Sequence, residues 1–251
     1  MWNDTLQRLH RLKELDRQRQ AFGADHHRYF LKSCLSEDDL AKAEERLGVA
    51  LPEQLREFYT TVGNGEAGPH YGLRPAGRLF PMRPTQPYPG AEHYRELSKR
   101  LGYQSRDGED YFEVPHDEIT GLAGIIGLGC GHEICIVTAG PLTGKIVEVS
   151  NDGYVIDAFD SLVDCYEDWL DEQLGTFEMV AELMASNVSL AQMYSQVRQK
   201  YRQANVYDVI VSIADVKKPE SLFGRPGQIR IHGASQKPWY AKVLSNWRAK
   251  R

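Results

Sequence analysis

The chain has few of the features on which whole classes of protein depend. Only 4 of its 251 residues are cysteine, which is too few for a small secreted scaffold held by disulfides. The longest uncharged run, residues 119–132, falls short of the roughly 20 apolar residues that a membrane helix needs. No apolar core follows a basic start, so we expect no secretory signal, no membrane attachment and a cytoplasmic protein.

Signatures of phosphate and cofactor binding are missing as well. No GxGxxG follows an expected strand, and no glycine loop ends in GK followed by Ser or Thr. The glycine-rich run GLAGIIGLGCG precedes an expected strand rather than a helix, so it presents no helix N-terminus to an anion. We therefore expect no cofactor.

The formal net charge of −5 conceals a strong asymmetry along the chain. Residues 1–35 carry a net charge of +3, residues 36–174 carry −15, and residues 175–251 carry +7. An acidic middle argues against nucleic-acid binding there, because phosphate contacts need a basic surface. It suits a basic protein partner, although solvation of the surface or a basic tail folded onto it would explain the charge equally well.

The stretch from Ser36 to Gly65 reads as two short helices and a stop. Ser36 is a good N-cap, and apolar residues follow at helical spacing until Gly48 ends the first helix. Pro52 starts the second helix, where its missing N–H does no harm. Asn64 and Gly65 then close it.

A run of short strands is predicted between Gly121 and Ala158. The apolar segments are 121–129, 134–139, 145–150 and 154–158, and the gaps between them are short and rich in glycine, proline and asparagine. Such short gaps join antiparallel neighbours, since a parallel crossover needs a dozen or more residues. Ser161 then caps a helix whose buried side includes Trp169.

Taken together, the two halves resemble the SUKH superfamily of Smi/Knr-like cell-wall-synthesis regulators and bacterial immunity proteins. The resemblance covers about residues 36–174 and rests on the following residues: Gly48, Pro52, Asn64, Gly65, Gly129, Gly131 and Trp169. It implies a helix-covered antiparallel sheet and a non-enzymatic role in binding proteins.

We therefore predict an α+β fold, a mostly antiparallel sheet with helices packed on one side, in three parts. Residues 1–35 form an amphipathic helical lead-in, with its helix from Thr5 to about Arg19, and residues 36–174 form the acidic SUKH-like domain. Residues 175–251 form a basic extension of mixed α/β structure. Its predicted elements are helices at 177–184 and 189–201, strands at 206–211 and 228–231, and a closing helix with Trp239, Val243 and Trp247.

One segment, CGHEIC, carries side chains that suit metal binding or nucleophilic catalysis. Cys130 or Cys135 would attack, with His132 or upstream His116 as the base. Zinc would use the same residue types together with Glu133. Alternation along a strand sends these side chains to opposite faces, and no CxxC pair is present. We therefore expect neither a metal site nor catalysis, and a Cys/His-dependent hydrolase remains the enzymatic alternative.

The resemblance implies a function in which the protein binds and neutralises a cognate toxin, and a nuclease toxin would supply the basic surface. We expect the partner to contact acidic residues in a loop and at the corner between the last strand and the following helix: Glu109, Asp110, Glu113, Asp157, Asp160 and Asp164. A regulatory scaffold that binds endogenous proteins is the main alternative. The sequence says nothing of the oligomeric state.

Overall fold

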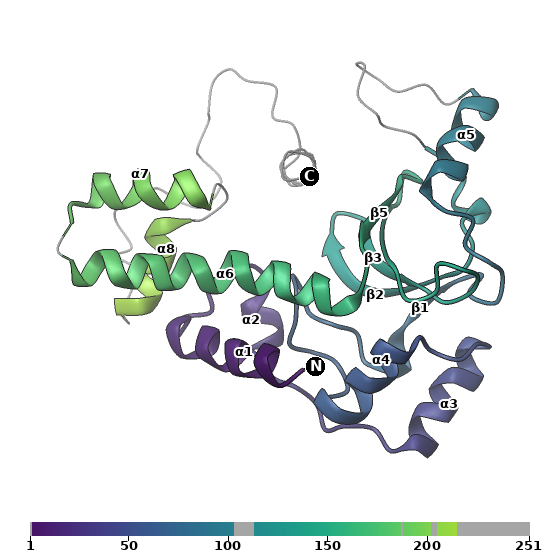
Figure 1. Cartoon of the computed structure of the whole chain (residues 1–251), viewed down its shortest axis with the longest axis horizontal. Helices are drawn as coiled ribbons and strands as arrows, with labels where there is room; N and C mark the ends of the chain where they lie inside the picture. Colours follow the sequence, from purple (N-terminus) through teal and green to yellow (C-terminus); the bar gives the residue numbers. More distant parts are fainter. Residues whose placement is uncertain (1, 103–112, 187, 202–204, 215–251) are drawn as a thin grey trace. The chain divides into compact units, whose positions relative to one another are not determined.

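An antiparallel sheet and the helices around it make up the computed structural model of this protein (Figure 1). The structure describes residues 2–102, 113–186, 188–201 and 205–214. The chain divides into two units, Met1–Val216 and Lys217–Arg251, and the described residues all belong to the first.

The sheet has five strands in chain order, and each pairs antiparallel with the next. They are β1 (Phe80–Met82), β2 (Leu122–Gly129), β3 (His132–Val137), β4 (Ile146–Ser150) and β5 (Val155–Phe159). Tight glycine turns join β2 to β3 and β4 to β5. Gly153 in the second turn has φ +79°, and an added Cβ there would lie 1.7 Å from the Val114 carbonyl oxygen.

The predicted helix pair between Ser36 and Gly65 is present. In α3 (Glu37–Leu47) the Ser36 hydroxyl accepts from the Asp39 N–H, and Gly48 ends the helix at φ +80°. After α4 (Glu53–Glu57) the helix continues as a π-helical segment, Phe58–Val62, and ends before Asn64 and Gly65 as expected. This segment buries Phe58 and Tyr59 in the core.

Apolar side chains cover both faces of the sheet. One face carries Ile134, Ile136 and Ile146, which join the main core together with residues of α3, α4 and α6 (Leu162–Ala185). The opposite face carries a smaller cluster that includes Cys135 and Val147. There α5 (Ala91–Leu101) packs its Tyr94 and Leu97 beside the sheet, so helices lie on both faces.

The lead-in helix α1 (Asn3–Leu15) lies along α6 (Figure 1). Trp2 anchors its start, with its ring 5.0 Å from Phe58 and 5.5 Å from Tyr166 between centroids. At its end, buried Asp16 accepts hydrogen bonds from the hydroxyls of Tyr29 and Ser212, each at 2.7 Å. The main core therefore includes residues on both sides of the family-like segment.

The remaining short helices are α2 (Ala24–His27), the 3₁₀ turns Ala76–Arg78 and His116–Glu118, α7 (Leu190–Lys200) and α8 (Val206–Ala214). Both α7 and α8 contact α6. Ser189 caps α7 through a reciprocal pair of bonds with Gln192.

Several sequence-based expectations about the flanks are wrong. Residues 206–211 are part of the helix α8 and not a strand, because packing of Val206 and Val209 in the core overrides the β-branched composition. The expected separate helix at 177–184 is the second half of α6, which continues through Gly175. The lead-in helix ends at Leu15, before Arg19. The expected strand at 228–231 and the closing helix lie outside the described residues.

Candidate protein-binding surface

Three of the predicted contact residues lie at the corner where β5 leads into α6. Asp157 is on β5, Asp160 follows the strand, and Asp164 is in the first turn of α6. All three side chains are exposed. The corner is fixed by Ser161, whose hydroxyl accepts from the Asp164 N–H at 3.0 Å and so starts the helix.

The interactions of these carboxylates differ. Asp160 forms an ion pair with Lys145 at 3.2 Å. Asp157 instead accepts from the Tyr88 hydroxyl at 2.9 Å, and Asp164 accepts from the Ser161 hydroxyl at 2.6 Å. A hydroxyl leaves a carboxylate its full negative charge. Within the described residues, therefore, no cation neutralises the charge of Asp157 or Asp164.

The other predicted contacts are less informative. Glu113 is half-buried, and its backbone N–H donates to the Ser98 hydroxyl at 3.2 Å. Among the described residues, no hydrogen bond or ion pair joins it to the corner acids. Glu109 and Asp110 lie outside the described residues.

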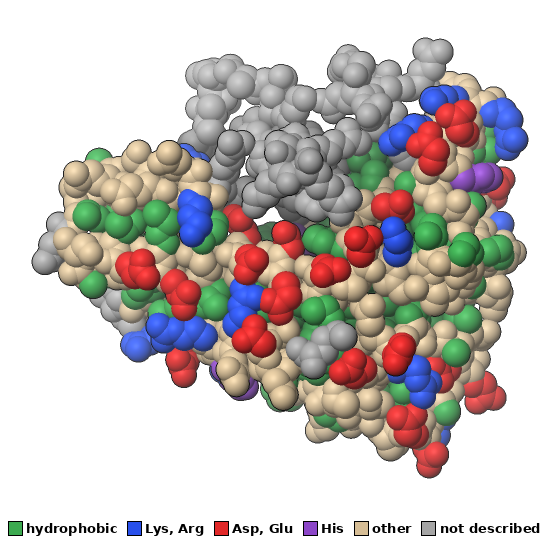
Figure 2. Space-filling model, in the orientation of Figure 1, with side chains coloured by type: hydrophobic (Ala, Val, Ile, Leu, Met, Phe, Trp, Pro, Cys, Tyr) green, Lys and Arg blue, Asp and Glu red, His purple; other side chains and the backbone are tan. Residues whose placement is uncertain are grey.

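More acidic side chains continue along α6, where the lead-in helix partly neutralises them. Arg8 forms ion pairs with Glu167 and Asp171, and Arg11 pairs with Glu178 at 3.6 Å. Figure 2 shows red carboxylates gathered over α6 with blue side chains among them. Part of the acidity of the middle segment, at Glu167 and Asp171, is therefore balanced within the molecule by the basic lead-in.

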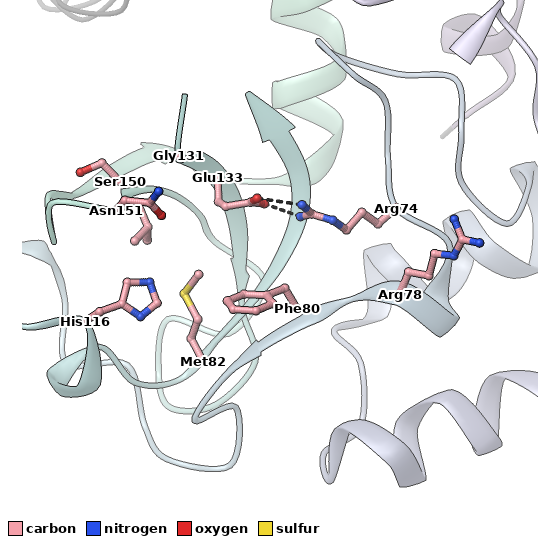
Figure 3. Close-up of a pocket in the computed structure, with 10 residues that line it drawn as sticks. Arg74, Arg78, Phe80, Met82, His116, Gly131, Glu133, Ser150 and Asn151 are labelled. Atoms are coloured by element: carbon pink, nitrogen blue, oxygen red, sulfur yellow. Dashed lines mark hydrogen bonds and ion pairs between the residues drawn. The ribbon is translucent and has the colours of Figure 1, made fainter. Parts of the chain in front are cut away.

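An open hollow of about 480 Å³ lies on the sheet face that also bears α5 (Figure 3). Phe80 and Met82 of β1 lie in its middle, with His116 and Asn151 toward one end and Arg74 and Arg78 toward the other. The Phe80 side chain is 49% exposed, which is high for a large apolar residue. The hollow thus offers a partner side chain an apolar surface and polar groups side by side.

An ion pair between Arg74 and Glu133 lies over the sheet beside this hollow (Figure 3). The pair is bidentate, with the second bond, from Arg74 Nη2 to Glu133 Oε1, at 2.7 Å. Hydrogen bonding to Glu133 raises the pKa of the guanidinium. Gly124 and Gly127 of β2 lie beneath it: an added Cβ at Gly124 would be 3.3 Å from Glu133 Oε2, slightly closer than usual, and one at Gly127 would make ordinary van der Waals contacts with both partners.

Sequence reasoning missed this ion pair. Arg74 lies in a proline-rich loop that suggested no specific role, and Glu133 was considered only as a zinc ligand. The glycine spacing within β2 was a usable signal, because strand glycines commonly mark a close approach by another group.

The residues on which the family resemblance rests lie at helix ends, in turns and where another part of the backbone approaches closely. Pro52 begins α4, and the Asn64 side chain accepts from the Ala76 N–H at 2.9 Å. An added Cβ at Gly65 would meet the Leu73 carbonyl at 2.5 Å. At the β2–β3 turn, Gly129 and Gly131 both have positive φ. Trp169 packs edge-on against Tyr166 at 6.3 Å between ring centroids.

Residues 34–171 match the model of the SMI1/KNR4 family (SUKH-1), which is more than half of the chain. The chain belongs to the SMI1/KNR4 family. Its fold agrees, since the matched segment holds the whole five-stranded sheet and the helices α3 to α5. Domains of this family are generally non-catalytic immunity or regulator domains. A comparison with curated proteins found no match to the chain.

The cysteines of this SMI1/KNR4 domain are poorly arranged for nucleophilic catalysis. Cys135 is fully buried, and burial raises the pKa of its thiol well above the ordinary value, which opposes thiolate formation. Cys130 is exposed in the β2–β3 turn, whereas His132 is buried with its Nδ1 3.0 Å from Glu148 Oε1. Cys130 is therefore exposed to solvent, whereas His132, two positions along, is buried against Glu148.

The same SMI1/KNR4 domain shows no cluster of three or more His, Cys, Asp or Glu side chains placed to hold a metal ion, as far as the described residues go. Nor do those residues include a helix whose length and apolar composition would let it cross a membrane.

Proposed function

We propose that this protein is an immunity protein that binds a basic toxin through the acidic corner between β5 and α6. The observation that carries the proposal is the state of Asp157 and Asp164. Both are exposed, and both are bonded to hydroxyls rather than to cations. Their charges remain available to a partner.

Membership of the SMI1/KNR4 family supports a role in immunity or regulation, and the charge argument favours a basic partner. Exposed carboxylates on one surface speed the encounter with a basic protein and discriminate against acidic ones. A nuclease toxin is basic where it binds phosphate, and an acidic protein seated there would block its substrate.

The first experiment is capture of the partner with the tagged full-length chain, followed by mass spectrometry at low and moderate salt. We expect one dominant basic protein whose binding weakens as salt rises. Its gene should arrest growth when expressed alone, and co-expression of the present chain should restore growth. Several endogenous partners without toxicity would instead support a regulatory scaffold.

The corner is tested by the double variant Asp157→Asn/Asp164→Asn, which removes two charges but keeps amide oxygens as acceptors. At low salt, association with the captured toxin should slow by about three- to tenfold, with less change in dissociation. The matched control is Asp38→Asn/Glu45→Gln on α3, which removes the same charge from another exposed surface. Equal slowing in both variants would show that only net charge matters and that the corner is not the contact.

A further inference from the structure

The hollow on the sheet is a second exposed feature of the surface, and none of the corner acids lines it (Figure 3). Phe80, in its middle, is 49% exposed and lies beside the almost fully buried Met82. A single apolar side chain on a convex surface is ordinary, but one that lines a hollow can contact an inserted side chain over a larger area. The middle of the hollow is therefore suited to an apolar side chain of another molecule.

The charged residues of the lining leave one cation without a counter-charge. Glu133 is neutralised by the two bonds from Arg74. Arg78 is exposed, and no carboxylate in the described part of the chain forms an ion pair with it. With histidine counted as neutral, two arginines against one glutamate give the lining a net charge of +1, whereas residues 36–174 as a whole carry −15. The hollow thus favours an acidic group, in contrast to the corner.

The backbone that carries these two side chains is fixed before a partner binds. Phe80 is on β1, which pairs with β2. Arg78 ends the 3₁₀ turn that begins at Ala76. The Ala76 N–H donates to the Asn64 side chain and its carbonyl accepts from Arg46, each at 2.9 Å. Groups held in advance lose less conformational entropy on binding, so more of their contact energy contributes to affinity.

The end of the hollow away from Arg78 offers a hydrogen-bonding group. The Asn151 side chain is exposed, and its carboxamide has no hydrogen-bond partner among the described residues. Gly131 makes room for it, since an added Cβ there would lie 2.2 Å from Asn151 Nδ2. A carboxamide both donates and accepts, so it can bond to a main-chain group of a bound segment.

The geometry points to the hollow as the place where the partner protein inserts an apolar side chain that has Asp or Glu next to it. The apolar side chain lies on Phe80 and Met82, and the carboxylate lies beside Arg78. This inference rests on the proposed function for the identity of the partner. It goes further in naming a second contact, whose charge preference is opposite to that of the corner. A requirement for both contacts would distinguish one basic protein from others.

A second copy of the chain is a poorer occupant of the hollow. Two copies that faced each other through it would bring both Arg78 side chains into one interface, and like charges there oppose association. An acidic segment from another surface of the second copy would make a head-to-tail contact, which repeats from copy to copy instead of closing.

A peptide titration of the full-length chain tests the hollow directly, with nuclear magnetic resonance signals of the Met82 methyl group and the His116 ring as the readout. The probe is a short synthetic peptide of alternating glutamate and leucine, and the control peptide replaces each glutamate with lysine. The glutamate peptide should shift both signals with a Kd of about 1 mM or tighter, and the lysine peptide should not. The net charge of −5 favours the lysine peptide, so simple attraction to the whole chain would give the opposite order. Equal shifts from both peptides, or none from either, would overturn the inference.

Variants of the two central residues test the hollow against the captured toxin. Phe80→Ser should raise the dissociation rate by about tenfold, and its control is Phe22→Ser, which replaces the same residue type at 48% exposure in the lead-in. Arg78→Glu should also raise the dissociation rate by about tenfold. Its control is Arg17→Glu, which makes the same change of net charge at an exposed residue of the lead-in. Both controls should leave dissociation within about twofold of the wild type, and the urea midpoint of each variant confirms that it is folded.

The outcomes distinguish this inference from the proposed function. If the toxin is captured but dissociates from Phe80→Ser and Arg78→Glu as slowly as from the wild type, the hollow is not a contact and the immunity function stands. If no toxin is captured, the proposed function fails, and the peptide titration still decides whether the hollow accepts an acidic, apolar segment. Met82 and His116 signals that move when the free chain is diluted would identify a second copy as the occupant and overturn the inference.

Discussion

At the scale of single residues, burial of histidine gives the protein a stability that depends on pH. His27 is buried, and its Nδ1 accepts from the Tyr29 N–H at 3.0 Å, while its Nε2 has no hydrogen-bond partner among the described residues. Burial, assisted by neighbouring His26, lowers the pKa of His27 from 6.5 to about 4. Burial also lowers the pKa of His70 to about 4. Both rings are therefore neutral in the folded protein at neutral pH.

We predict that the free energy of unfolding falls as the pH drops from about 6.5 to about 4. Between these pH values His27 takes up a proton in the unfolded chain but not in the folded protein. Lowering the pH therefore stabilises the unfolded state relative to the folded one. The shift in His27 corresponds to at most about 3 kcal/mol. His27→Asn should remove roughly half of the pH dependence, because His70 retains its share.

The measurement is urea unfolding between pH 7 and pH 4.5, with the exposed His93→Asn as the control variant. His93→Asn should keep the wild-type dependence. An unchanged slope in His27→Asn would mean that His27 is readily protonated in the folded state, contrary to its burial.

At the scale of elements, local signals in the sequence predicted most of the sheet and the helices around it. Ser36 and Gly48 bound α3 as expected, and Ser161 caps α6 as predicted. These features depend on neighbouring residues alone. The helix at 206–214 was missed because its helical state depends on packing against α6, which is distant in sequence.

The site was less predictable than the fold. The shared position of Asp157, Asp160 and Asp164 at one corner could be predicted because they are close in the chain and Ser161 caps the helix; their contact with a partner remains a prediction. The pairing of Arg74 with Glu133 joins residues 59 positions apart, so the glycine spacing of β2 could indicate a close approach there but could not identify the two partners. The neutralisation of α6 acids by Arg8 likewise depends on how α1 packs on α6.

The effect on stability of replacing Gly175 in α6 depends on Tyr201, at the end of α7. An added Cβ at Gly175 would lie 2.2 Å from the hydroxyl of buried Tyr201, at the end of α7. In a helix interior alanine is otherwise favoured over glycine by about 1 kcal/mol. Gly175→Ala should therefore destabilise the protein by about 1–2 kcal/mol, because overpacking outweighs propensity.

A double-mutant cycle with Tyr201→Ala tests this explanation. Without the ring, Gly175→Ala should become stabilising by up to about 1 kcal/mol, since only the helix propensity remains. Thermal or urea unfolding of the four proteins measures both effects. The same sign in both backgrounds would rule out the steric contact as the cause.

At the scale of the whole molecule, the core extends well beyond the residues that match the family. Leu9 and Leu12 of α1 and Val209 of α8 belong to the main core cluster. Asp16 connects the two flanks through Ser212, whose hydroxyl donates at 2.7 Å. The division of the chain at residues 35/36 and 174/175 remains a prediction, and these core contacts cross both boundaries.

Truncation gives a direct test of this extended core. A chain of residues 1–216 keeps α8 and should unfold within a few degrees of the full-length protein. A chain of residues 1–205 loses α8, exposes α6 and leaves buried Asp16 without the Ser212 hydroxyl, so we expect a loss of about 2–4 kcal/mol. Circular dichroism during heating measures both, and equal midpoints would show that α8 contributes nothing to stability.

The strand order also has a consequence for the speed of folding. From β2 to β5 each strand pairs with the one that follows it in the chain, so these hairpins close only short loops. The Asp16–Ser212 contact joins residues 196 positions apart, and its loop-closure entropy is met only once much of the chain is ordered. During synthesis residues 122–159 leave the ribosome before Ser212 does, so we expect the sheet to form first and the two flanks to dock last.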